Sequence, residues 1–236
     1  APDTRGDLNR AASLYPYVSV RGVASTDLRA LLLDPAVRVI SCERTDLCSW
    51  SALARPDPWI HINLRVCTSR DRDWPACRPR VDALRLALCG SGCVDGALES
   101  TSARDVAITH EGPLALHPLA QHHDLSRVIV SGALLDGLEA LEQAPLRELS
   151  LSAPSLPSAA TQLVQKLDPT LQRLHLLSVE PFPPALALLG THTRFIRVSA
   201  HLGLRDEWVS FAVRNPQVGF AFVPVITPPI RRARRR

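Results

Sequence analysis

Several residue types are scarce in this 236-residue chain. It contains no methionine and only one lysine, Lys166, so arginine carries nearly all of the positive charge. Aromatic residues make up 5% of the chain. The apolar runs, of which Ala185–Gly190 is one of the longest, are far too short to cross a bilayer, so we expect no transmembrane segment. A hydrophobic content of 46% excludes a disordered chain and indicates a substantial core.

Most of the chain carries no excess of positive charge. The net charge is +4, but Arg231–Arg236 alone contributes five arginines and leaves 22 basic against 23 acidic residues elsewhere. We therefore expect a Pro- and Arg-rich tail over residues 226–236. Such a tail can bind nucleic acid, acidic proteins or anionic lipid, or it can be a solvated end. Nucleic-acid binding is expected only through this tail.

Cysteine is absent beyond residue 93. An even, clustered set is typical of a disulfide-stabilised end of a secreted protein, which favours an extracellular or periplasmic location. Free buried thiols in a cytoplasmic protein are the alternative. No CxxC pair occurs, so the spacing does not indicate a zinc site. The candidate disulfide residues are Cys42, Cys48, Cys67, Cys77, Cys89 and Cys93.

An apolar phrase with the form apolar-x-x-apolar-x-apolar returns about every 22 residues. A period of this length predicts a stack of small units, because one unit cannot bury its apolar face alone. We expect about ten irregular repeats over residues 17–225, after a lead-in or cap over residues 1–16. The four fullest copies are Val81–Leu84–Leu86, Leu125–Val128–Val130, Leu146–Leu149–Leu151 and Leu171–Leu174–Leu176.

Each repeat is expected to hold one short strand with two inward residues, because apolar and other residues alternate there. The ten predicted inward pairs are Val18/Val20, Val37/Val39, Ile60/Ile62, Leu84/Leu86, Val106/Ile108, Val128/Val130, Leu149/Leu151, Leu174/Leu176, Ile196/Val198 and Phe220/Phe222. Leucine spacing and capping residues predict short helices between some strands. They are expected within Ser25–Asp34, Gly132–Gln143, Ser158–Leu167, Pro183–Leu189 and Leu204–Val213.

A strand, a connection and a short helix in about 22 residues resemble the leucine-rich repeat family. The family phrase L-x-x-L-x-L-x-x-N/C matches best from Val81 to Cys89, and Cys42 likewise follows Val39 by three residues. The resemblance implies an α/β solenoid with a parallel sheet on the concave side and short helices or turns on the convex side. The competing architecture is a (β/α) barrel or a doubly wound sheet, whose repeating units commonly exceed about thirty residues.

The residue between each inward pair is expected to face away from the core. Arginine and aromatic side chains on that face are typical of protein interfaces. The resemblance to the family therefore implies a non-enzymatic module that binds a protein partner, with an acidic one as a candidate, and no cofactor. The predicted binding residues are Arg38, Trp59, His61, Arg85, Arg127, Arg173, His175, Phe195 and Arg197.

Two local motifs keep a hydrolase on a parallel α/β scaffold as an alternative. Ser91 lies between glycines in Cys89–Cys93, but the full G-x-S-x-G pattern is absent, and a tight turn is expected there. His122, His123 and Asp124 lie near two further histidines, His110 and His117. Adjacent histidines on an extended segment face opposite ways, so we expect a polar loop and no metal site.

Overall fold

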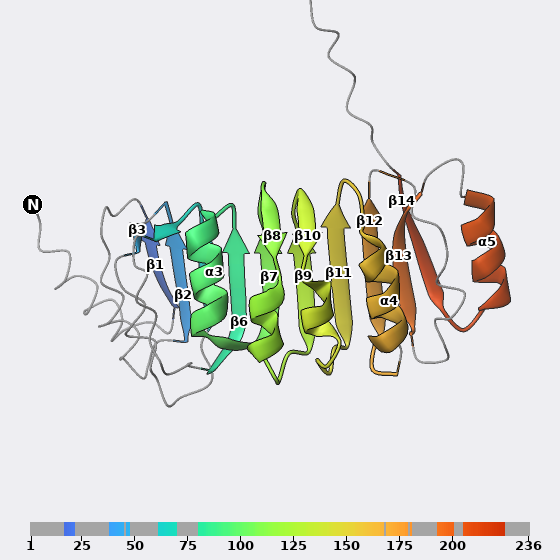
Figure 1. Cartoon of the computed structure of the whole chain (residues 1–236), viewed down its shortest axis with the longest axis horizontal. Coiled ribbons are helices and arrows are strands. Elements are labelled where there is room, and N and C mark those ends of the chain that lie inside the picture. The colour runs from blue at the N-terminus through green and yellow to red at the C-terminus, as the bar shows by residue number, and fades with distance from the viewer. Residues whose placement is uncertain are drawn as a thin grey trace, which may run out of the picture.

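The computed structural model describes residues 17–21, 38–44, 46–47, 61–69, 80–167, 169–178, 180, 193–200 and 205–224. Over these residues the chain has an α/β structure built on one large parallel sheet (Figure 1). The predicted lead-in over residues 1–16 and the arginine tail lie outside the described residues.

The sheet has ten described strands, and their order in the sheet follows their order in the chain. Each strand pairs in parallel with the strand before it and the strand after it. The strands are β1 (Tyr17–Arg21), β2 (Val39–Glu43), β4 (His61–Arg65), β6 (Arg80–Ala87), β7 (Ser102–Thr109), β9 (Arg127–Ser131), β11 (Glu148–Ala153), β12 (Arg173–Ser178), β13 (Phe195–Ala200) and β14 (Gly219–Pro224).

Helices and two minor ladders lie on the return paths between these strands. The ladders pair β3 (Asp46–Leu47) with β5 (Thr68–Ser69), and β8 (Pro113–Ala115) with β10 (Leu134–Asp136). Figure 1 shows α3 and α4 on the same side of the sheet. The described helices are α3 (Ser91–Ser100), the 3-10 helices η2 (His117–Gln121) and η3 (Leu138–Leu141), α4 (Ser158–Leu167) and α5 (Arg205–Arg214).

The core lies between the sheet and these helices. All twelve apolar residues of the four fullest phrase copies are buried, with Leu149 and Leu151 fully inaccessible. On the helix side, Leu98 of α3, Leu138 of η3 and Leu163 of α4 are buried against them. Neither layer could bury its apolar face without the other, because one short strand or helix offers too little apolar area.

The pairing register gives a more regular spacing than the apolar pattern alone. Val18, Ile40, Ile62, Leu84, Val106 and Val128 occupy matched positions, each 22 residues after the one before. Eight of the ten predicted pairs, Val18/Val20 and the seven from Leu84/Leu86 onward, occupy matched register positions. Phe222 of the last pair is 39% exposed, so its predicted inward position is wrong.

The predicted inward pairs of the second and third units are wrong. The buried residues of β2 are Ile40 and Cys42, not Val37 and Val39, and in β4 the pair is Ile62/Leu64. Both phases of the β2 sequence contain apolar residues, so alternation alone could not choose between them. Val37 and Ile60 lie outside the described residues.

Two of the predicted helices are confirmed. Ser158–Leu167 forms α4, and Leu204–Val213 is matched within one residue by α5, which buries Trp208 and Phe211. Gly132–Gln143 instead forms β10 and η3, because Gly137 between them takes φ +76° and breaks a continuous helix. The helices expected within Ser25–Asp34 and Pro183–Leu189 lie outside the described residues.

The left-handed turn at Gly137 should depend on glycine. A Cβ at this position would lie 2.7 Å from Nδ1 and 2.8 Å from the backbone nitrogen of His117. We expect Gly137→Ala to lower the free energy of unfolding by at least about 1–2 kcal/mol, from the left-handed strain of an L-residue alone. Urea unfolding followed by circular dichroism measures this change.

The matched control is Gly92→Ala on α3, where an added Cβ would meet no atom within 4 Å. We expect that variant to be unchanged or more stable by up to about 1 kcal/mol, because alanine favours the helix. Equal stability of the two variants would contradict the role given to Gly137.

Candidate functional site

The face of the sheet opposite the helices, here called the open face, carries the candidate site. Strand register places its side chains in rows that run across the strands. The central row consists of Ser19, Ser41, Asn63, Arg85, Ala107, Ile129, Ser150, His175, Arg197 and Ala221. The second row consists of Tyr17, Val39, His61, Ala83, Asp105, Arg127, Glu148, Arg173, Phe195 and Gly219.

Seven of the nine predicted binding residues lie in these two rows. Two positions differ from the sequence prediction as a result of the register correction. Ser41 and Asn63 take the central-row places predicted for Arg38 and His61. His61 moves to the second row, Arg38 lies one residue before β2, and Trp59 is outside the described residues.

A third row, here called the entry row, immediately precedes the second row. Backbone amides link it across the sheet: the N–H of Ser126 donates to the Arg104 carbonyl, and the N–H of Arg147 donates to the Ser126 carbonyl, each at 2.8 Å. The described entry row consists of Arg38, Asp82, Arg104, Ser126, Arg147, Gln172, Arg194 and Val218. Of these residues the sequence prediction includes only Arg38, because it covers residues between the inward pairs or next to them, whereas Arg104, Arg147 and Arg194 lie two positions before an inward residue.

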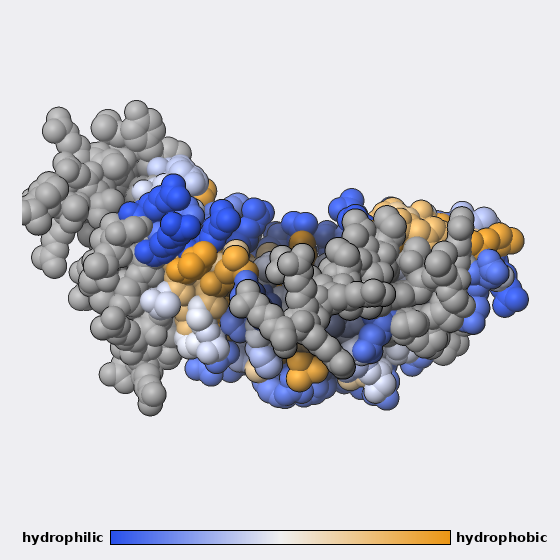
Figure 2. Space-filling view, turned by 90° about the horizontal axis from the view of Figure 1, so that it is seen from above, coloured by the Kyte–Doolittle hydropathy of each residue, from blue (hydrophilic) through white to orange (hydrophobic). Residues whose placement is uncertain are grey.

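The three rows carry more positive than negative charge. Eight arginines occur in them, against three acids, Asp82, Asp105 and Glu148. On the other side of the sheet, α3 and η3 carry acids and no basic residue. Figure 2 shows hydrophilic residues along the side of the molecule that carries the sheet. The three rows of the open face therefore carry a net positive charge.

Glu148 organises the positive charge in the second row. Its carboxylate forms ion pairs with arginines of the two neighbouring strands, at 3.2 Å from Arg127 Nε and 3.7 Å from Arg173 Nη1, and only 14% of the Glu148 side chain is exposed. His61 Nε2 lies 2.9 Å from Asp82 Oδ2. These pairs hold some arginines in place and leave others, such as Arg85 and Arg197, with no ion pair in the described part of the chain.

Burial shifts two ionisable groups on the open face. It raises the pKa of Asp105 above its ordinary value, and the Arg127 guanidinium opposes that shift. Burial also lowers the pKa of His175. The charge of Glu148 acts in the opposite direction, and nearby arginines lower the pKa further. The His175 ring meets Phe195 edge to face, with centroids 5.8 Å apart. At neutral pH the pair therefore offers an uncharged aromatic surface between Arg173 and Arg197.

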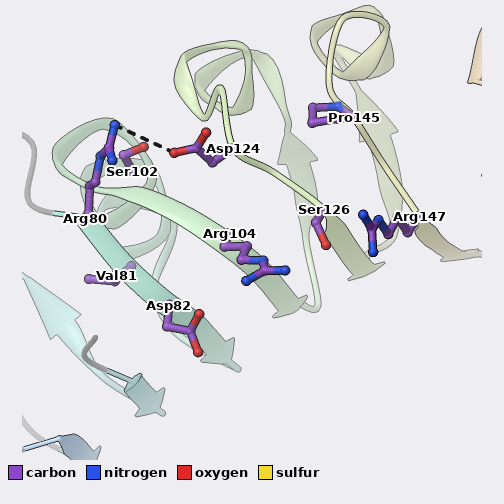
Figure 3. A pocket seen from close by; sticks show the side chains of 9 residues that line it. All are labelled: Arg80, Val81, Asp82, Ser102, Arg104, Asp124, Ser126, Pro145 and Arg147. Atoms are coloured by element: carbon purple, nitrogen blue, oxygen red, sulfur yellow. Dashed lines mark ion pairs between the residues drawn. The ribbon is translucent and has the colours of Figure 1, made fainter. Parts of the chain in front are cut away.

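Pockets line the strand starts on the open face. One has a volume of about 430 Å³ and lies across the starts of β6, β7, β9 and β11 (Figure 3). Its lining residues are Arg80, Val81, Asp82, Ser102, Arg104, Asp124, Ser126, Pro145 and Arg147. A pocket of about 260 Å³ adjoins it and shares Asp82, Arg104, Ser126 and Arg147 with it. A further pocket of about 320 Å³ shares Asp105 and Arg127 with the 260 Å³ pocket.

The described cysteines form a buried group at the N-terminal end of the sheet. The Cys67 thiol donates to the Cys42 carbonyl at 3.4 Å, and the Cys89 thiol donates to the Leu64 carbonyl at 3.5 Å. No disulfide links Cys42, Cys67, Cys89 and Cys93 to one another, so these four candidate disulfide residues do not pair among themselves. Cys48 and Cys77 lie outside the described residues.

The histidines near Asp124 are dispersed. Buried His122 accepts the Ala103 N–H at its Nδ1 (2.9 Å), so Nε2 carries the proton that is donated to the Leu98 carbonyl at 2.9 Å. His117 pairs with Asp136 and Glu139 instead. Within the described residues, no group of three or more histidines, cysteines and acids is arranged to hold a metal ion.

Ser91 does not form a catalytic arrangement with these histidines. It is the exposed first residue of α3, so the segment after the glycine turn is helical, contrary to the sequence expectation. His110 Nδ1 lies 3.1 Å from the carbonyl oxygen of Cys89. Within the described residues, His110 makes no hydrogen bond to the Ser91 side chain. A nucleophilic serine would need a base within hydrogen-bond reach.

Comparisons of the chain with protein-family models, with curated proteins and with solved structures find no significant match. Among the described helices, none has the length and apolar character needed to span a bilayer. The function must therefore be argued from the open face itself.

The buried thiols should resist alkylation in the folded protein. Burial raises the pKa of Cys42 to about 12. The hydrogen bond with Cys67 lowers the pKa of Cys89, but the hydrogen bond with Cys93 and burial outweigh it and raise this pKa to about 11. Both thiols therefore stay protonated at pH 8, whereas the thiolate is the reactive form. We expect slow iodoacetamide labelling of both in native protein and fast labelling in urea, read by peptide mass spectrometry. If the cysteines stay unlabelled in urea and become labelled only after a reductant is added, they are disulfide-bonded, and the assignment of free thiols is wrong.

The stability of the fold should fall on mild acidification because of His175. Its folded-state pKa is lowered, so the unfolded chain binds the proton more readily, and stability is lost as the pH falls through the ordinary value of about 6.5. We expect His175→Gln to reduce the drop in urea midpoint between about pH 7.5 and about pH 5. His123→Gln, which removes an exposed imidazole elsewhere, is the control; an equal effect of both would refute the assignment.

Proposed function

We propose that this protein is a non-enzymatic binding module, a leucine-rich-repeat-like solenoid that recognises an acidic protein partner on the open face. The observation that carries the proposal is that Arg85, Arg104, Arg147 and Arg197 make no ion pair in the described part of the chain and lie on a sheet face that no described helix covers. Arginine binds carboxylates through a planar fork of donors and is enriched in interface hot spots. An acidic surface supplies the complementary charge.

The arrangement of strands supports a solenoid. The described strands follow chain order across the sheet without a reversal, whereas a doubly wound sheet reverses its order at a switch point. The recurring 22-residue step between matched buried residues is too short for the usual βαβ unit. Cys67 and Cys89, three residues after the second inward residue of their strands, donate back to a carbonyl of an earlier unit.

The open face also supplies contacts other than charge. His175 and Phe195 form an aromatic pair in the middle of an arginine cluster, with both side chains partly exposed. Aromatic groups next to arginines give an interface apolar area at low cost in side-chain entropy. A partner with acidic side chains around a small apolar group would match this part of the face.

Charge reversal on the open face tests the proposal. We expect Arg85→Glu combined with Arg197→Glu to weaken binding of a fluorescein-labelled decaglutamate peptide at least tenfold, which is about 1.4 kcal/mol. Fluorescence polarisation at about 50 mM salt measures the affinity, because screening weakens such contacts at higher salt. The two arginines are exposed, so their replacement should leave the fold intact, as circular dichroism would show.

Two further variants are controls for this experiment. Arg214→Glu reverses an exposed charge at the end of α5 and should change the affinity less than twofold. Deletion of Arg231–Arg236 should also leave most of the affinity. Unchanged binding by the double variant, or binding lost only on deleting the tail, would reject the open face as the binding surface.

A further inference from the structure

The pocket of about 430 Å³ at the strand starts holds two guanidinium groups and a hydroxyl, which offer more hydrogen-bond donors than one carboxylate can accept. Arg104, Ser126 and Arg147 stand at the same position of three neighbouring units, and Figure 3 shows Ser126 between the two arginines. The backbone hydrogen bonds from Ser126 to Arg104 and from Arg147 to Ser126 keep this order. Adjacent strands lie about 4.8 Å apart, so both guanidinium groups can reach one ligand placed over Ser126.

The carboxylates of the same pocket are already paired. Asp82 Oδ2 lies 2.9 Å from His61 Nε2, and Asp124 Oδ2 lies 3.8 Å from Arg80 Nη2 at the far side of the pocket. The pocket wall carries three arginines against these two carboxylates, so it keeps a net positive charge of one, and Arg104 and Arg147 are the arginines left without an ion pair in the described part of the chain.

The carboxylates of the adjoining pocket are also balanced by other arginines. Glu148 is held by Arg127 and Arg173, and the charge of Arg127 acts on Asp105 more strongly than that of Arg104 does. Neither acid therefore neutralises Arg104 or Arg147 fully. An anion that enters between these two arginines meets a net positive site.

We propose that this pocket is a subsite for a phosphorylated side chain of the protein partner, a proposal that rests on the proposed function. A phosphomonoester carries a charge of about −1.5 to −2 at neutral pH and three acceptor oxygens, which two arginine forks and a hydroxyl can satisfy together. A carboxylate has two acceptor oxygens and a single charge, so it satisfies fewer of the donors of the two guanidinium groups and the Ser126 hydroxyl. The volume of about 430 Å³ admits a whole phosphorylated side chain along the wall that Pro145 provides.

A pair of matched peptides tests the subsite. Both are glutamate-rich and identical except for one central residue, which is serine in the first and phosphoserine in the second. We expect wild-type protein to bind the phosphorylated peptide at least tenfold more tightly, because only the phosphate engages both free arginines. Fluorescence polarisation of each labelled peptide gives the two dissociation constants, and their ratio is the readout.

The ratio of the two dissociation constants should fall to about one in the variant Arg104→Gln combined with Arg147→Gln. Both residues are exposed, so circular dichroism should show an intact fold. The matched control is Arg85→Gln, which lies on the open face outside this pocket; it should weaken both peptides by the same factor and preserve the ratio. A ratio near one in wild type, or a ratio unchanged in the double variant, would overturn the subsite.

The outcome separates the subsite from the proposed function. If the unphosphorylated peptide still depends on Arg85 and Arg197 while the ratio is near one, only the subsite fails. If a 5′-phosphorylated oligonucleotide or inorganic phosphate binds the pocket more tightly than the phosphopeptide does, the phosphoprotein assignment is overturned. If the affinity for the unphosphorylated peptide is unchanged when Arg85 and Arg197 are replaced, the proposed function is wrong, whatever the ratio.

Discussion

The parallel hydrogen-bond ladder that joins the ten strands determines where every side chain of the open face lies. Because neighbouring strands pair in register, residues such as Leu84 and Val106 stack on the core side, and Arg85 and Ala107 stack on the other. A slip of one residue would exchange the two sets and expose the leucines to water. The cost of exposing the core therefore also holds the arginine rows in place.

The division of the molecule into two faces follows from this constraint. The helices cover one face and bury its apolar residues, while the other face is free to carry charge. Glu148 uses that freedom to hold Arg127 and Arg173, and His61 holds Asp82, whereas Arg85, Arg104 and Arg147 make no ion pair in the described part of the chain. Electrostatic repulsion among the arginines is limited by these paired carboxylates, which makes a dense basic surface compatible with a stable sheet.

Particular residues show how far the sequence could be interpreted without the structure. Ser158–Leu167 was predictable as a helix because Leu163, Val164 and Leu167 recur at helical spacing on one side. The strand over Leu149–Leu151 was predictable because only one phase of its sequence is apolar. In β2 both phases are apolar, and only pairing with Ile62 and Leu64 selects Ile40 and Cys42 as the buried residues. Gly137 interrupts leucine spacing that otherwise predicts a helix, through a backbone angle that spacing does not contain.

The sequence by itself determined the repeat length, the apolar phrase and the concentration of arginine before and within strands, because these are properties of spacing and composition. The tertiary structure decided which arginines share a surface and which are neutralised. Arg104 and Arg147 are 43 residues apart in the chain, and only the strand order brings them to either side of Ser126. Whether a charge is available depends on a neighbour from another strand, and that neighbour is set by the ladder rather than by local sequence.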